Sequence, residues 1–224
     1  MIEVVVVGEG PTEESFVRDV LAPRFLDRRI FIQPRLIPTS KGARGGGLTR
    51  DRVLRYLRNT LRERSDTYVT TFFDLYGLAS DFPGRGEADA IPDPLARASA
   101  IESRLSEAVV SEAQCRVDRF LPHLQPHEFE ALLFADPDRL IEIEPDWKRY
   151  AEVLRAARVD AFSPEHIDDG VDTHPSARLK LLKPRFEKVL HGPAAAARIG
   201  LERMRNECGH FDAWLERIEA LKSL

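Results

Sequence analysis

The sequence predicts an α/β protein with a mainly parallel, four-stranded sheet flanked by helices, and with a helical C-terminal extension. Short β-branched runs alternate with segments of helical periodicity up to about residue 121. This alternation requires crossover connections between parallel strands. Beyond residue 136 the pattern is almost entirely helical, and 224 residues suffice for one core with an appendage. We therefore expect a core at 1–135 and a helical region at 136–224 packed on it.

The first strand is the clearest element, because residues 2–7 are almost all apolar and β-branched, as in a strand buried on both faces. Either Thr12 as N-cap or Pro11 as first-turn residue then starts a helix. The third strand ends on Asp74, and a loop rich in Gly, Pro and Asp follows at 77–94. The expected elements are strands at about 2–7, 29–38, 68–73 and 115–121, and helices at about 12–26, 49–64, 95–112, 137–157, 176–189, 194–206 and 211–222, with breaks at 171–175 and 191–193.

The charge pattern favours contact with a polyanion at one part of the chain. The net charge of −4 excludes a generic nucleic-acid coat, but residues 18–64 contain 13 Lys or Arg and 4 Asp or Glu. A basic stripe beside acidic motifs suits a metal-using nuclease, whose carboxylates hold cations while Arg and Lys hold phosphates. The alternative is a set of solvated helix faces on which arginine serves solubility.

Cysteine usage and hydropathy indicate a cytoplasmic protein without a membrane segment. No apolar run approaches the roughly 20 residues needed to span a bilayer, and no signal-peptide pattern is present. Cys115 and Cys208 stand in unrelated contexts, so neither a disulfide framework nor a zinc site is expected.

Three carboxylates are expected at one edge of the sheet. Glu9 follows the first strand, Glu13 lies near the start of the first helix, and Asp74 closes the third strand. The carboxyl ends of parallel strands form the edge where ligands bind in open α/β sheets. Carboxylates so close would repel one another, and a divalent cation such as Mg²⁺ or Mn²⁺ relieves that conflict. The alternatives are a helix-terminal acid for Glu13 and a turn residue for Asp74.

Two further acids follow the fourth expected strand. Glu128 and Glu130 could each be a metal ligand, but at helical spacing they do not share a face, so we expect one of them to reach the site. His127 could assist proton transfer or cap a turn, and His123 is a weaker candidate.

A glycine-rich segment at 39–47 supplies the candidate phosphate-binding residues. Its glycines allow close approach of the backbone to a phosphate, and Lys41, Arg44 and Arg50 supply positive charge. It is not a Walker motif, and a surface loop is the alternative. Lys180 and Lys183 could also contact phosphate or could lie on a solvated helix face.

Residues 5–14 (VVVGEGPTEE) resemble the first motif of the Toprim fold, and are closest to nucleases of the overcoming-lysogenization-defect type. More specifically, the chain resembles the DUF4276 family of Toprim-like proteins over nearly its whole length. The residues that carry this resemblance are 9–14 (EGPTEE), 73–76 (FDLY), 127–134 (HEFEALLF), 172–176 (DTHPS) and 208–214 (CGHFDAW).

The resemblance implies a Toprim core of four parallel strands that binds Mg²⁺ or Mn²⁺, and its first acid maps to Glu9. The second Toprim motif is usually Asp-x-Asp, but here it reads Asp74-Leu75-Tyr76, so its second aspartate is missing. The acids that could compensate are Glu13, Asp81, Glu128 and Glu130. The resemblance also implies a partner ATPase encoded alongside and a role in phage defence.

The leading hypothesis is a nuclease that cuts DNA or RNA by metal-assisted hydrolysis. Glu9 and Asp74 would bind the metal, Glu13 would bind or orient it, and Lys41 would hold phosphate at the catalytic site. The alternatives are a non-catalytic module that binds a nucleotide or a partner protein, which the missing aspartate favours, and a phosphotransfer enzyme acting on a small molecule. The sequence leaves the oligomeric state open.

Overall fold

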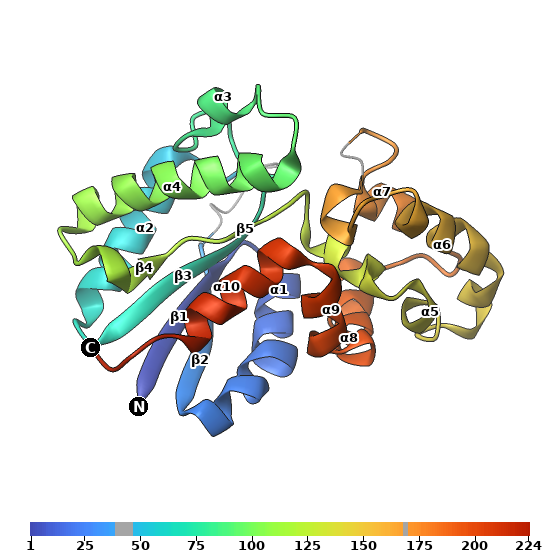
Figure 1. Ribbon diagram of the computed structural model, residues 1–224, viewed down its shortest axis with the longest axis horizontal. Helices are drawn as coiled ribbons and strands as arrows, with labels where there is room; N and C mark the ends of the chain where they lie inside the picture. The colour runs from blue at the N-terminus through green and yellow to red at the C-terminus, as the bar shows by residue number, and fades with distance from the viewer. Residues whose placement is uncertain (39–46, 168–169) are drawn as a thin grey trace.

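The computed structural model describes residues 1–38, 47–167 and 170–224, and its centre is a parallel five-stranded sheet (Figure 1). The strand order is β2-β1-β3-β4, and β5 continues the line of β4 along β3. The predicted α/β class with a mainly parallel sheet is therefore confirmed. The strands are β1 Ile2–Gly8, β2 Ile30–Leu36, β3 Thr67–Asp74, β4 Phe120–Leu121 and β5 Leu124–Gln125.

The alternation of side chains along β1 gives the molecule two hydrophobic cores. Val4 and Val6 pack into one core, and Val5 and Val7 pack into the other. Successive side chains of a strand point to opposite faces, so an unbroken valine run fills both faces of a central strand. This position between β2 and β3 explains why β1 carries so few polar residues.

Helices cover both faces of the sheet. On one face lie α2 (Arg50–Glu63), α3 (Arg85–Ala88) and α4 (Pro94–Ala113), and on the other lie α1 (Pro11–Phe16) and α10 (Gly209–Glu219) (Figure 1). The remaining helices gather beyond the sheet on the side of α1. They are α5 Pro137–Leu140, α6 Ala151–Val159, α7 Pro175–Leu179, α8 Lys188–Ile199 and α9 Leu201–Glu207.

The C-terminal helices share the core of α1 and the sheet. Trp147, Leu179, Met204 and Trp214 belong to the same buried cluster as Phe16. The predicted helical C-terminal segment is thus present, while a domain division at residue 135 stays a prediction. Within the described residues, no helix has both the length and the apolar character needed to cross a membrane.

The first helical segment differs from the expected regular helix. Gly10 rather than Thr12 is its N-cap, so the Pro11 alternative is the one observed. After Phe16 the chain continues as a π-helical turn at Val17–Leu21 and a 3₁₀ segment at Ala22–Arg28. Pro23 lacks the N–H that an α-helical bond needs, which favours a change of helix type there.

The fourth strand is much shorter than the predicted 115–121. Only Phe120–Leu121 pair with β3, and Val117–Arg119 form a 3₁₀ turn. The guanidinium of Arg119 donates to the carbonyl oxygens of Leu61 and Thr67, each at 3.0 Å. These buried hydrogen bonds hold the segment in a turn instead of an extended strand.

The long C-terminal helices of the prediction are also broken differently. Residues 137–157 divide into α5, a 3₁₀ segment at Pro145–Tyr150, and α6. The helix predicted at 176–189 is only the short α7, which ends at Leu179. The break predicted at 191–193 lies inside α8. Pro193 removes one helical hydrogen bond to Val189, which is half-exposed, so water can satisfy that carbonyl.

Candidate metal centre

The carboxyl edge of the sheet brings together acids that are far apart in the sequence. Glu9 follows β1, and the backbone N–H of Asp74 at the end of β3 donates to Glu9 Oε1 at 3.0 Å. Asp74 Oδ1 in turn accepts the backbone N–H of Phe129 at 2.8 Å. Residues 9 and 74 therefore lie at one rim of the sheet, as the strand pattern predicts.

Both acids of the segment after β5 reach this rim. One carboxylate oxygen from each of Asp74, Glu128 and Glu130 lies within 4.8 Å of the others, so the three could hold a metal ion. Both Glu128 and Glu130 therefore reach the rim, although their helical spacing predicted that only one would, and their role as metal ligands stays a prediction. Glu128 is extended (φ −160°, ψ 166°) and precedes the 3₁₀ segment Phe129–Ala135, so helical spacing does not apply to the pair.

Glu13 has a structural role at this edge as well as a position in the cluster. It is buried, and its Oε2 accepts the backbone N–H of Gly10 at 3.0 Å, which caps the start of α1. The helix-terminal interpretation of Glu13 is therefore correct in part. Its charge also raises the pKa values of Glu9 and Asp74, which places it beside them. We call Glu9, Glu13, Asp74, Glu128 and Glu130 the carboxylate cluster.

A lysine that the sequence did not single out completes the cluster. Lys188 is the first residue of α8, and its Nζ lies 3.2 Å from Glu128 Oε2 and 3.0 Å from Glu130 Oε2. Burial alone would lower the pKa of Lys188, but the charges of Glu130 and Glu128 raise it above its ordinary value. Lys188 therefore stays protonated. No motif marks it, because it comes from a helix far along the chain.

The electrostatics of the cluster show a shortage of positive charge. Burial raises the pKa of Glu9 to about 7, and the charge of Glu13 adds to this effect. Burial likewise raises the pKa of Glu130 to about 7. The pKa of Asp74 lies well above its ordinary value, because the group is buried and Glu13 and Glu9 are close. One lysine does not neutralise five carboxylates, and a divalent cation would lower these pKa values.

Glu128 differs from the other acids because it is held by the C-terminal region. Burial acts to raise the pKa of Glu128, but the charge of Lys188 and hydrogen bonds with His174 and Ser176 bring it below the ordinary value. Glu128 Oε1 lies 2.9 Å from His174 Nδ1 and also accepts the backbone N–H of Ser176. This carboxylate is therefore ionised and fixed in position at neutral pH.

The donor set fits a hard divalent cation. Asp74, Glu128 and Glu130 offer only oxygen, the ligand type that Mg²⁺ and Mn²⁺ prefer. Within the described part of the chain, Glu130 Oε1 is fully buried and has no hydrogen-bond partner. A buried carboxylate oxygen without a partner is costly unless a cation or water satisfies it.

The candidate phosphate-binding residues are only partly placed. Lys41 and Arg44 lie outside the described residues. Arg50 is the exposed first residue of α2. A Cβ on Gly47 would lie 3.3 Å from the carbonyl oxygen of Gly77, and a Cβ on Gly77 would lie 3.4 Å from Glu9 Oε2. The start of α2 is therefore close to the carboxylate cluster. Asp81, by contrast, is exposed and does not belong to the group of Asp74, Glu128 and Glu130 that could hold a metal ion.

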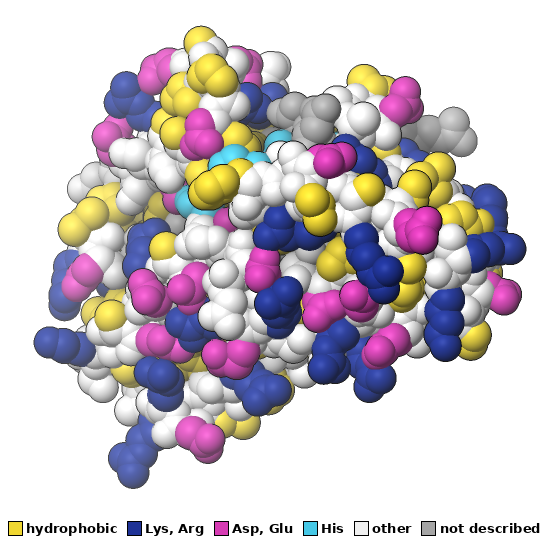
Figure 2. Space-filling model, turned by 45° about the vertical axis from the view of Figure 1, so that its right-hand side comes forward, with side chains coloured by type: hydrophobic (Ala, Val, Ile, Leu, Met, Phe, Trp, Pro, Cys, Tyr) yellow, Lys and Arg dark blue, Asp and Glu magenta, His cyan; other side chains and the backbone are white. Residues whose placement is uncertain are grey.

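The basic stripe at 18–64 is partly neutralised by acids. Arg35 pairs with Glu63 at 2.6 Å, and Arg58 pairs with Glu112 at 2.8 Å. On the face shown in Figure 2, basic and acidic side chains are interspersed. The structure thus supports the solvated-face interpretation for Arg35 and Arg58. Arg52 on α2 is a stripe residue whose charge acts on the cluster, because it lowers the pKa of Glu9.

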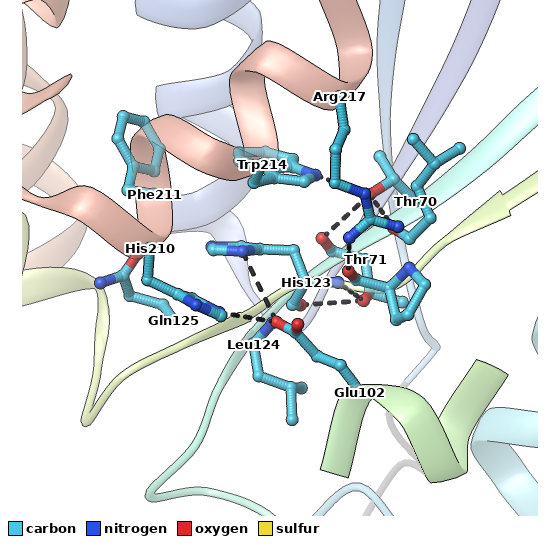
Figure 3. Close-up of polar contacts among 12 residues, drawn as sticks. Thr70, Thr71, Glu102, His123, Leu124, Gln125, His210, Phe211, Trp214 and Arg217 are labelled. Carbon is cyan, nitrogen blue, oxygen red and sulfur yellow. Dashed lines mark hydrogen bonds and ion pairs between the residues drawn. The ribbon is translucent and has the colours of Figure 1, made fainter. Parts of the chain in front are cut away.

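A second group of possible metal ligands lies beside β3. Glu102 on α4, His123 between β4 and β5, and His210 on α10 have ligand atoms within 4.8 Å of one another (Figure 3). The His210 Nε2 atom lies 2.8 Å from Glu102 Oε1, but the His123 and His210 rings are stacked, with centroids 5.2 Å apart and planes at 25°. An imidazole binds a metal in its ring plane, so two stacked rings do not aim at one ion. This group fits a buried hydrogen-bonded network better than a metal centre.

Comparison with known proteins identifies one family. The family model described as "Domain of unknown function (DUF4276)" matches residues 8–219, which is nearly the whole chain. No curated protein and no solved structure matches the chain.

Proposed function

Since the chain belongs to the DUF4276 family, whose description assigns no activity, we propose from its site that it is a metal-dependent nuclease hydrolysing phosphodiester bonds of DNA or RNA. The observation that carries the proposal is the convergence of Asp74, Glu128 and Glu130, with oxygens within 4.8 Å of one another, beside Glu9. Carboxylates crowded at the ligand-binding edge of a parallel sheet are costly unless a cation binds there.

The residues of such a site would have different roles. Asp74, Glu128 and Glu130 would hold Mg²⁺ or Mn²⁺, with Glu9 and Glu13 adjoining them. The ion would polarise the phosphate and make bound water a better nucleophile. Lys188, which stays protonated between Glu128 and Glu130, would stabilise negative charge that develops on the phosphate.

The missing second aspartate of the Toprim pattern favours the competing proposal, a non-catalytic module that binds a nucleotide or a partner protein. Tyr76 occupies that position, and its ring stacks on His174 with centroids 5.2 Å apart. Glu128 and Glu130 nevertheless supply the carboxylates that Tyr76 cannot. We therefore favour the nuclease. A Toprim-like mechanism, a cytoplasmic location, a partner ATPase encoded alongside and a role in phage defence belong to the same proposal.

The direct test is cleavage of plasmid DNA and of RNA by the purified protein with Mn²⁺ or Mg²⁺, alone and with a neighbouring ATPase. We expect cleavage that EDTA abolishes and that Asp74→Asn lowers at least 100-fold, on the order of the effect of removing a key transition-state interaction. Glu14→Gln is the matched control, because Glu14 follows Glu13 on α1 but lies outside the cluster. Cleavage that survives Asp74→Asn, or no metal-dependent cleavage at all, would remove the nuclease proposal. Binding that survives Glu9→Ala without turnover would support the module instead.

A further inference from the structure

A pocket of about 300 Å³ opens beside the carboxylate cluster. Its lining residues are Ser176, Lys180, Arg185, Phe186, Glu187 and Lys188. Two of them touch the cluster, because Ser176 donates its backbone N–H to Glu128 and Lys188 bridges Glu128 and Glu130. Whatever occupies the pocket would therefore adjoin the candidate metal centre.

In the part of the chain that the structure describes, two of the three cations that line the pocket are not paired with an acid. Lys180 and Arg185 are exposed, and within the described residues neither side chain has an ion pair or a hydrogen bond. Elsewhere many arginines are paired, as Arg198 is with Glu142 at 2.6 Å. Glu187 is the single acid of the lining. Lys180 and Arg185, which have no ion pair within the described residues, lie beside the protonated Lys188 and could bind an anionic group.

The side chains that line the pocket indicate which part of a nucleotide, the phosphate or the base, it would bind. Phe186 is the aromatic residue of the pocket, and only 8% of its surface is exposed, since it packs against Trp147 and His191. Base binding to single strands uses exposed aromatic faces on which bases stack. The pocket offers charge and little aromatic surface, so it suits a phosphate better than a base.

We propose that this pocket binds a phosphate of a nucleic-acid strand next to the phosphate that lies at the metal centre, with Lys180 and Arg185 as its binding residues. This inference rests on the proposed function and deepens it, because it names a polyanionic strand as the substrate. Contacts to a flanking phosphate position a strand without reading its sequence. The phosphate is either an internal one or a terminal 5′-phosphate.

The test compares Lys180→Ala/Arg185→Ala with the wild-type protein, using short fluorescein-labelled single-stranded DNA and RNA of one sequence. Each probe is made with a 5′-phosphate and with a 5′-hydroxyl, and binding is measured in Ca²⁺ over a range of salt. We expect the double variant to bind about 10-fold more weakly, with a salt slope smaller by about 0.7 for each phosphate that the variant no longer neutralises. Mn²⁺ binding, measured by calorimetry without nucleic acid, should not change, because neither residue contacts a carboxylate of the cluster.

The matched control is Arg24→Ala/Lys222→Ala, which removes two exposed cations distant in sequence from the pocket and outside its lining. We expect its affinity to equal that of the wild type. A weakening confined to the 5′-phosphorylated probes identifies a terminal phosphate, and an equal weakening on both kinds identifies an internal one.

Two outcomes would overturn the assignment, and they are distinguishable. If the wild type cleaves nucleic acid but the pocket variant keeps its affinity and salt slope, the pocket assignment fails and the nuclease stands. If the wild type neither binds these probes nor cleaves any substrate, both proposals fail together.

Discussion

At the scale of single residues, Asp74 is the position where the charge needed to bind a metal most clearly destabilises the metal-free fold. It is half-buried at the end of β3, its pKa is raised, and its Oδ1 accepts the N–H of Phe129. Asp74→Asn keeps an oxygen for that hydrogen bond and removes a crowded charge. We therefore expect the metal-free variant to be more stable at pH 8 by on the order of 1 kcal/mol, or about 2–4 °C in Tm.

Thermal unfolding with and without Mg²⁺ checks this expectation. Mg²⁺ should raise the Tm of the wild type and leave that of Asp74→Asn almost unchanged, because ligand binding to the native state stabilises it. Glu14→Gln should respond to Mg²⁺ as the wild type does. A variant that is less stable than the wild type, and still stabilised by Mg²⁺, would contradict the placement of Asp74 in a metal centre.

Lys188 gives the second prediction at this scale. Its Nζ is the cation nearest the buried acids Glu128 and Glu130, although its own side chain is 47% exposed. Lys188→Met should lower the free energy of unfolding of the metal-free protein by on the order of 1 kcal/mol, because Glu130 then lacks its ion pair. Saturating Mg²⁺ should reduce this deficit by restoring positive charge.

Denaturant unfolding of Lys188→Met, with Lys148→Met as an exposed lysine control, measures the effect. The control should unfold as the wild type does. An equal deficit with and without Mg²⁺ would show that Lys188 stabilises the fold independently of the cation site.

The sequence identified the acids that follow long buried strands, and missed partners that only packing brings near. Glu9 and Asp74 could be placed because β1 and β3 are adjacent and parallel. Lys188, His174 and Ser176 could not, since they come from helix ends whose positions depend on the C-terminal packing. Spacing rules also failed at Glu128, where the extended backbone is a local conformation that the residue type does not encode.

At the scale of elements, length decided which strands were predictable. β1 and β3 are seven and eight residues long and almost wholly buried, so composition alone marks them. β4 and β5 are two residues each, too short to produce a pattern, and they form because β3 offers a free edge. The ends of the helices after residue 136 were also hard to predict, because prolines and tertiary contacts divide this region into short helices.

Helix α10 is attached to the sheet by polar contacts as well as by apolar packing. Trp214 Nε1 donates to Thr70 Oγ1 on β3 at 2.8 Å, and His210 Nε2 lies 2.8 Å from Glu102 Oε1 on α4 (Figure 3). Burial opposes the charged form of His210, but Glu102 raises the pKa of the ring above its ordinary value. The His210–Glu102 pair is therefore an ion pair at pH 6, below the ordinary pKa of histidine.

This pair predicts a pH-dependent effect of Glu102→Gln. A histidine with a raised folded-state pKa binds more protons in the native state, so its stabilisation is complete below the unfolded pKa of about 6.5 and is lost as pH rises through the folded value. The variant should therefore be destabilised more at pH 6 than at pH 9. Denaturant unfolding across this range measures it, with Glu107→Gln, an exposed acid of the same helix, as control. A pH-independent loss of stability would show that Glu102 acts only through its hydrogen bond to the N–H of Leu124.

At the scale of the whole molecule, the C-terminal helices complete the site that the sheet begins. The strand ends supply Glu9 and Asp74, while α8 supplies Lys188 and the segment before α7 supplies His174. The two regions also share one hydrophobic core. Binding at the carboxylate cluster should therefore stabilise the chain as a unit, because both regions contribute to the same site.

The pH dependence of global stability follows from the raised pKa values of Glu9 and Glu130, each about 7. An acid whose folded-state pKa is raised binds more protons in the native state than in the unfolded state between about pH 4.5 and 7. Its stabilising contribution is present at low pH and is lost as pH rises through 7. These two acids should therefore make the metal-free protein less stable at pH 8 than at pH 6. Mg²⁺ needs the ionised carboxylates, so its stabilisation should be larger at pH 8.

This linkage is tested by thermal unfolding of the wild type and of Glu9→Gln/Glu130→Gln at pH 6 and pH 8, with and without Mg²⁺. The double variant cannot release these two protons, so it should lose much of the fall in stability between pH 6 and 8 and most of the stabilisation by Mg²⁺. The pKa of Asp74 should also move toward its ordinary value in the variant, because the charges of Glu9 and Glu130 help to raise it. Groups outside the cluster, such as the buried His123 with its lowered pKa, titrate equally in both proteins and cancel in the comparison. If wild type and double variant show the same pH profile and the same response to Mg²⁺, the two acids do not share a cation, because a shared cation must compete with their protons.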